Sequence, residues 1–92
     1  MATRADLPPL PQFEPLTDPS SLGQRWKNWV KWFKTYIVAT NITDDKQKRA
    51  MVLYQAGPAT QEIFETIPDT GDDFDTALTK LNAIFRKKER RL

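Results

Sequence analysis

The sequence contains no cysteine and no histidine. Without cysteine the chain can form neither disulfides nor thiolate zinc sites, and without histidine it has no imidazole for acid–base or nucleophilic chemistry. These absences exclude Ser/His/Asp and Cys/His triads and most other enzyme classes. We therefore expect a non-enzymatic protein with no catalytic residues, no metal site and no cofactor.

Long hydrophobic runs are also missing. No segment approaches the roughly 20 consecutive apolar residues of a membrane-spanning helix, and the proline-rich N-terminus lacks the apolar core of a signal peptide. These features predict a chain without a membrane span, and we expect it to be cytoplasmic.

The charge is small overall but unevenly placed. The chain has 92 residues, enough for one small domain, and a net charge of +2. Residues 86–92, RKKERRL, carry about +4, which leaves about −2 on the first 85 residues. Any contact with RNA or other phosphates is therefore expected at this end, from Arg86, Lys87, Lys88, Arg90 and Arg91.

The first 19 residues hold five of the seven prolines. Proline fixes φ and removes an amide donor, so residues 1–19 are predicted to form an extended arm. Its apolar residues Leu7, Leu10, Phe13 and Leu16 are placed to lie along a groove of the body. The alternative is that LPPLP serves as a ligand for an SH3-type domain.

The strongest helical pattern follows the arm. Ser20 or Ser21 is a suitable N-cap, and Asn41 is a suitable terminator. Between them, helical spacing predicts one buried stripe that contains Leu22, Trp26, Trp29, Val30, Phe33 and Ile37. Trp32 and Tyr36 lie at the edge of this stripe, and Lys27, Lys31 and Lys34 form the opposite face.

Three further helices are predicted. The second has a cap at Thr43, the apolar residues Ala50, Met51, Leu53 and Tyr54, and an end at Gly57-Pro58. A short third helix, PATQEIFETI, places Ile63, Phe64 and Ile67 inward and stops at Pro68. The fourth is capped by Asp72 or Asp73 and has an apolar side of Phe74, Ala77, Leu78, Leu81, Ile84 and Phe85.

These patterns predict an all-α fold, a compact bundle of about four helices behind the proline-rich arm. The predicted divisions are the arm at 1–19, the helical domain at 20–85 and a basic tail or helix end at 86–92. The expected core comprises Trp26, Trp29, Phe33, Leu53, Phe64, Leu78, Leu81 and Phe85.

The tripeptide Asp69-Thr70-Gly71 also occurs in retroviral-type aspartic proteases. A protease needs this tripeptide at the end of an apolar strand, with two copies meeting on a dimer axis. Here it lies between two helical patterns, so we interpret it as a loop in which Gly71 turns and the next acids cap a helix. A calcium loop is also disfavoured, because position twelve counted from Asp69 is Lys80.

The stretch WKNWVKW places three tryptophans among lysines. Stacking on single-stranded bases or binding at a membrane surface would require exposed rings. We expect Trp26 and Trp29 to be buried, whereas exposed Trp32 and Tyr36 would mark a protein interface. The predicted contact residues are therefore Trp32 and Tyr36, together with Leu10 and Phe13 of the arm.

The order of these pieces resembles the Gag polyprotein of gypsy-type LTR retrotransposons, at the N-terminal part of its capsid region. The resemblance covers about Leu7 to Phe85. It rests on Trp26 and Trp29 with Phe33 and Tyr36, on NITDDKQKRA, on AGPATQEIF and on DTGDDFDTALTKLNAIF. Such polyproteins usually continue into a second helical domain and a Cys/His zinc knuckle, which are not found in these 92 residues.

The resemblance implies an all-helical capsid domain, related to retroviral capsids and to domesticated Gag proteins such as Arc. Its implied work is self-assembly with copies of itself or with related Gag proteins, without catalysis. Two alternatives stay open. One is a peptide-binding adaptor whose groove holds its own arm or a partner's short segment, and the other is a nucleic-acid binder that uses the basic tail.

Overall fold

The computed structural model describes residues 10–89, and this part of the chain is all-α with no β-strand. A 3₁₀ turn, η2 (Pro19–Ser21), leads into α1 (Leu22–Ala39), which is followed by α2 (Asp45–Ala56), the short α3 (Pro58–Glu65) and α4 (Phe74–Lys88). The predicted fold class is confirmed. Within the described range, no helix is long and apolar enough to cross a membrane.

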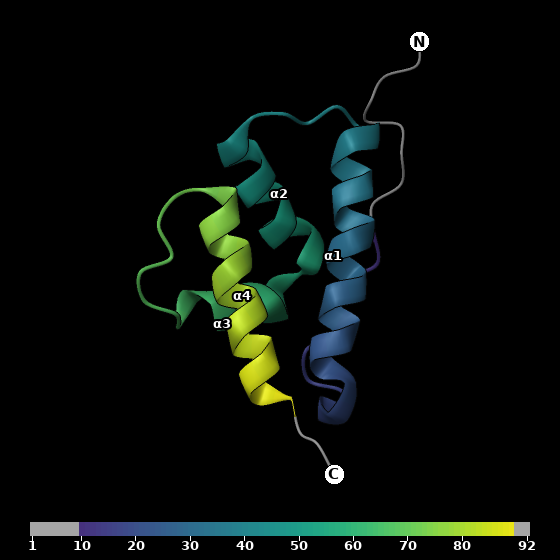
Figure 1. Cartoon of the computed structure of the whole chain (residues 1–92), viewed down its shortest axis with the longest axis vertical. Coiled ribbons are helices and arrows are strands. Elements are labelled where there is room, and N and C mark those ends of the chain that lie inside the picture. Colours follow the sequence, from purple (N-terminus) through teal and green to yellow (C-terminus); the bar gives the residue numbers. More distant parts are fainter. Residues whose placement is uncertain (1–9, 90–92) are drawn as a thin grey trace.

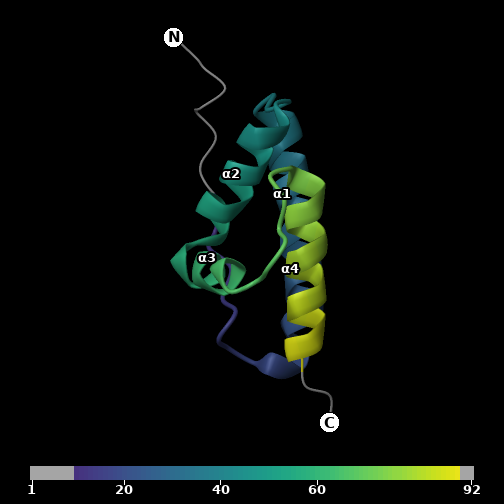
Figure 2. The ribbon, with the colours of Figure 1, turned by 90° about the vertical axis from the view of Figure 1, so that its left-hand side faces the viewer.

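The helices form a long pair with a shorter pair beside it. α1 and α4 lie side by side and run in opposite directions (Figure 1). α2 and α3 lie together on one side of this pair, and the loop after α3 returns the chain to the start of α4 (Figure 2). Residues 10–18 lie outside the helices and precede η2, whereas Leu7, Arg90, Arg91 and Leu92 lie outside the described residues.

The aromatic side chains of α1 stack along the axis of the helix. The predicted stripe is buried, and its indole and phenyl rings follow one another at the i, i+3 and i+4 spacings that place side chains on one face. Trp26 stacks on Trp29 with ring centroids 5.4 Å apart, and Trp29 stacks on Phe33 at 5.5 Å. These contacts order the buried face of α1.

The helix ends follow local chemistry. Asn41 has a left-handed φ of 61°, while Asn41 N–H donates to Val38 C=O and Ile42 N–H to Ile37 C=O, so α1 ends in a Schellman motif at the predicted residue. The predicted cap of α2 at Thr43 is wrong by one residue. Asp44 is the N-cap, and its carboxylate accepts the Gln47 N–H at 2.9 Å.

The buried face of α2 also differs from the prediction. Val52, Gln55 and Ala56 are buried, whereas the expected core residue Leu53 is only half-buried and Tyr54 is 76% exposed. The cause is the continuous run Ala50–Met51–Val52–Leu53–Tyr54, which places apolar side chains on several faces of one helix. Contacts with α3 and α4 then decide which of these residues are covered.

Phe13 of the arm completes the core. Its ring is 5% exposed and lies 5.0 Å from Trp26 of α1 and 5.2 Å from Phe85 of α4, measured between ring centroids. Trp26 and Phe85 are themselves 4.9 Å apart. We call Phe13, Trp26 and Phe85 the aromatic triangle. It joins the arm to both long helices.

Gly57 allows the arm to approach the junction of α2 and α3. Its φ of 102° is one that residues other than glycine rarely adopt. A Cβ at this position would also meet the Gln12 side chain at 2.9 Å. Gly57 therefore provides both the turn that ends α2 and the space in which the arm passes.

Truncating Phe13 should destabilise the whole domain. Phe13→Ala removes a ring from the aromatic triangle and should lower the free energy of unfolding by about 3–5 kcal/mol. Leu16→Ala is the matched control, since Leu16 lies in the same segment but is 81% exposed and should cost less than about 0.5 kcal/mol. Urea denaturation followed by circular dichroism measures both. Equal losses in the two variants would contradict the role of Phe13.

Candidate functional site

The Asp-Thr-Gly tripeptide lies in the loop between α3 and α4. Asp69 is exposed with a φ of 56°, and Gly71 has a φ of 62°. Arg49 of α2 donates one N–H to Thr70 C=O at 2.8 Å and one to Asp73 C=O at 3.1 Å. Asp73 caps α4 by accepting the Thr76 N–H at 3.0 Å. The loop thus has a structural explanation at each of these positions.

The acidic residues of this loop do not converge. Among residues 10–89, no group of three or more acidic side chains is arranged to hold a metal ion. Asp45, at the start of α2, contacts the end of this loop, because its carboxylate accepts the Phe74 N–H at 3.2 Å. Together, Asp45 and Arg49 fasten the start of α4 to α2.

Trp32 is the exposed member of the tryptophan cluster. Its side chain is 58% exposed, whereas Trp26 and Trp29 are buried. A groove of about 670 Å³ runs between residues 11–14 of the arm and the adjacent face of α1, and Trp32 lines it together with Trp29 and Thr35. Of the predicted contact residues, Trp32 is therefore the one most accessible to a partner.

The other three predicted contact residues are tied into the domain. Tyr36 is half-buried, and its hydroxyl accepts a bond from Gln55 Nε2 at 3.4 Å. Leu10 is half-buried and packs against the core, and Phe13 belongs to the aromatic triangle. In this structure Phe13 is a core residue, because the arm packs on its own domain.

Two side chains and one backbone carbonyl of the body hold the arm through its backbone. Leu10 N–H donates to the buried Gln55 side chain at 3.1 Å, Trp29 Nε1–H donates to Pro11 C=O at 2.8 Å, and Phe13 N–H donates to Ala56 C=O at 3.0 Å. The proline-rich segment cannot pair its own N–H and C=O groups within a helix, so α1 and α2 supply the partners.

Arg25 holds the second half of this segment. Its guanidinium donates to Glu14 C=O at 2.8 Å, to Asp18 C=O at 3.0 Å and to Thr17 C=O. The same side chain lies over the Phe13 ring, 5.5 Å from its centroid. One arginine therefore both closes the turn before η2 and covers the ring that the arm contributes to the core.

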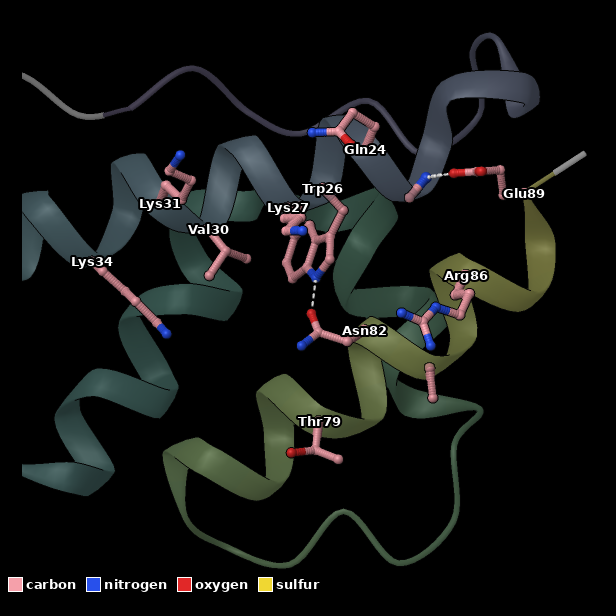
Figure 3. A pocket seen from close by; sticks show the side chains of 12 residues that line it. Gln24, Trp26, Lys27, Val30, Lys31, Lys34, Thr79, Asn82, Arg86 and Glu89 are labelled. Atoms are coloured by element: carbon pink, nitrogen blue, oxygen red, sulfur yellow. Dashed lines mark hydrogen bonds between the residues drawn. The ribbon is translucent and has the colours of Figure 1, made fainter. Parts of the chain in front are cut away.

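A second cleft, of about 710 Å³, lies between α1 and α4 (Figure 3). Lys27, Lys31 and Lys34 reach it from α1, and Arg86 reaches it from α4. Neutral polar groups line it as well, and Asn82 Oδ1 accepts the Trp26 Nε1–H at 2.7 Å across the cleft floor. Because α1 and α4 are antiparallel, Arg86 lies beside Gly23 at the start of α1, and the three lysines follow along α1 from there.

One carboxylate is present among the described residues that line this cleft. It belongs to Glu89, and it accepts the Gly23 N–H at 2.6 Å. Gly23 lies in the first turn of α1, where backbone N–H groups have no partner within the helix. The end of α4 therefore caps the start of α1, and the negative charge is held at the positive end of the helix dipole.

The predicted phosphate-contact residues are divided between two environments. Arg86, Lys87 and Lys88 are exposed in the last turn of α4, where cations are favoured by the negative end of the helix dipole. Arg90 and Arg91 lie outside the described residues. Of the three described residues, Arg86 alone lines the α1–α4 cleft, whose lining also includes α1 lysines that the tail-based prediction does not include.

Comparison of the chain with protein-family models, with curated proteins and with solved structures finds no match in any of the three. The resemblance to gypsy-type Gag therefore stays a prediction, and the surfaces above have to support a function by their own geometry.

The cap of α4 should make stability depend on pH. Hydrogen bonds from the Thr76 side chain and N–H lower the pKa of Asp73 in the folded chain. The unfolded chain then binds more protons in acid, so the stabilisation is complete above the unfolded pKa of about 3.9 and is lost as the pH falls through the lowered folded pKa. Melting temperatures at pH 7, 4 and 2.5 measure this loss.

Asp73→Ser is the matched variant for this prediction, because serine is also a good N-cap but does not titrate. The melting temperature of the native chain should fall toward, or below, that of Asp73→Ser as the solution becomes acidic. A difference between the two chains that is the same at all three pH values would contradict the assignment.

Proposed function

We propose that this chain is a non-enzymatic, capsid-like domain of Gag type that works by associating with copies of itself, and that Trp32 is at the centre of the contact. The observation that carries the proposal is the exposure of Trp32. The other two tryptophans of the same helix are buried, so this ring is not needed to fill the core. Tryptophan is enriched among residues that dominate interface energetics.

The surroundings of Trp32 support a protein contact. The groove beside it is lined by groups of both charge signs, Glu14, Arg25 and Lys31, next to the aromatic rings. Interfaces commonly combine an aromatic centre with a polar rim. The resemblance of the sequence to the capsid region of gypsy-type Gag supports a second copy of this chain as the partner.

Replacing Trp32 with serine should weaken self-association. Sedimentation velocity over a concentration series, at low and near-physiological salt, should show reversible oligomers of the native chain. Loss of a central tryptophan should raise the dissociation constant by about 30-fold, equivalent to about 2 kcal/mol. Tyr36 is left unchanged in this test because its hydroxyl contacts the buried Gln55.

Tyr54→Ser is the matched control, since Tyr54 is an exposed aromatic residue on α2 and is even more accessible than Trp32. Its association should equal that of the native chain, and circular dichroism should show that both variants are folded. Unchanged association of Trp32→Ser would remove Trp32 from the interface. A strict monomer at every concentration would contradict self-association itself.

A second candidate function is binding of a partner's peptide in the place of the arm. It is favoured by the way the arm is held, through backbone groups of Leu10, Pro11 and Phe13 and through one inserted aromatic ring. An extended segment of another chain with proline and phenylalanine at matching positions can satisfy the same groups. In this scheme the arm is an internal competitor.

Peptide competition tests this candidate. A peptide of residues 7–16 should bind a chain that lacks residues 1–16 and raise its melting temperature, because the ring of Phe13 refills the core. A tethered arm competes at an effective concentration of about millimolar, so binding to the full chain should be at least about tenfold weaker. A peptide with Phe13→Ala is the control. Equal binding to both chains, or none to a folded shortened chain, would contradict the scheme.

A further inference from the structure

We infer that the cleft between α1 and α4 binds the phosphate backbone of single-stranded RNA. This site shares Lys31 with the Trp32 groove but lies on the α4 side of α1, and it does not depend on self-association. It consists of Lys27, Lys31 and Lys34 on α1 and Arg86 on α4, together with the neutral hydrogen-bond donors of Gln24, Thr79 and Asn82 (Figure 3).

The charge of the cleft selects an anion. Four cationic side chains line it, and the one carboxylate among the described lining residues already accepts the Gly23 N–H. Concentrating like charges in a concave site between two helices raises the local positive potential. The first 85 residues carry about −2 overall, so this cleft is a positive site on a body that is otherwise slightly acidic.

The spacing of the cations suits a repeating anion. Lys27, Lys31 and Lys34 follow one another at i, i+4 and i+7, and at 1.5 Å per residue they form a row of about 10 Å along α1. Arg86 adds a planar guanidinium from the facing helix, a group that binds phosphate oxygens with two parallel N–H bonds. A polynucleotide backbone offers one negative charge per nucleotide along such a row.

The lining argues against an acidic peptide as the occupant. Peptides bind mainly by burying apolar side chains, and the large apolar side chain of this cleft, Trp26, is 2% exposed with its Nε1–H already bonded to Asn82. No large apolar side chain of the lining is therefore exposed enough to receive an anchor. The same burial removes a stacking platform, so we expect binding that depends on salt and not on base sequence.

Single-stranded RNA fits this shape better than a duplex. The cleft is lined by two adjacent helices, and a flexible strand can follow such a groove while its bases remain outside. A rigid duplex presents a convex surface to the protein, which reaches only the rim of a cleft of this kind.

Fluorescence anisotropy with a labelled oligouridylate of about 12 nucleotides tests the inference on the full chain. Lys27→Gln/Lys34→Gln should weaken binding about tenfold at 50 mM salt, and the slope of log K against log salt should change from about −3 to about −1.5, as expected for four and two phosphate contacts. Lys31 is left unchanged because it also borders the Trp32 groove.

Two further variants test whether RNA binding depends on the charges of the cleft or only on the net charge of the chain. Lys46→Gln/Lys48→Gln makes the same change of net charge on α2, outside the cleft, and should weaken binding less than about twofold. Glu89→Gln keeps an oxygen acceptor for Gly23 but removes the negative charge from the cleft, so it should strengthen binding.

Several results would overturn the inference. They are no binding by the native chain, an equal effect of the α2 control pair, and unchanged or weaker binding by Glu89→Gln. A loss confined to Arg90→Gln/Arg91→Gln would assign the contact to the C-terminal residues instead of the cleft. Stronger competition by a poly-glutamate peptide than by unlabelled oligouridylate would show that the occupant is an acidic protein segment.

Discussion

The packing of Phe13 against Trp26 and Phe85 is the contact on which the other features depend. It brings together an arm without regular structure, the first long helix and the last one. Since α1 and α4 meet at this point, their polar faces border the basic cleft, and since the arm enters here, its backbone borders the Trp32 groove. Both candidate surfaces are therefore consequences of one aromatic contact.

Long polar side chains supply hydrogen-bond partners to the backbone of the irregular segments, as neighbouring strands do in a β-sheet. Arg25 binds carbonyls of the arm and the following turn, Arg49 binds those of the loop before α4, and Gln55 binds the arm while contacting Tyr36. Each pairs backbone groups that lie outside the helices and would otherwise lack a hydrogen-bond partner within the protein. A domain of this size can thus hold two irregular segments without disulfides.

Much of the fold is predictable from residue spacing and local capping chemistry. The stripe of α1, the break at Gly57-Pro58 and the cap at Asp73 all depend on near neighbours in the chain. The end of α3 before Pro68 does so too, although the helix ends at Glu65, two residues earlier than predicted. The buried face of α2 is not predictable in this way, because its apolar run has no clear side. The cap at Asp44 is predictable from local sequence, since Asp44 and Gln47 have the spacing of a capping box.

The candidate surfaces are harder to predict because they require pairs of elements. Helical spacing places Lys27, Lys31 and Lys34 on one face of α1, but nothing in the sequence states that Arg86 of α4 lines the same cleft. Phe13 is similar, since an irregular arm has no periodicity from which burial can be read. Trp32 is the exception, because its position at the edge of a stripe already distinguishes it from its two neighbours.

The bond between Glu89 and Gly23 has a consequence for synthesis on the ribosome. It joins residues 66 positions apart, and the aromatic triangle likewise requires Phe85. Contacts of such long range form only after a costly loop closure. During translation, the stacked aromatic rings of α1 therefore stay uncovered until nearly all of the described chain has left the exit tunnel, and the core closes in one late step. Until then, nascent chains on one messenger expose the same rings to one another.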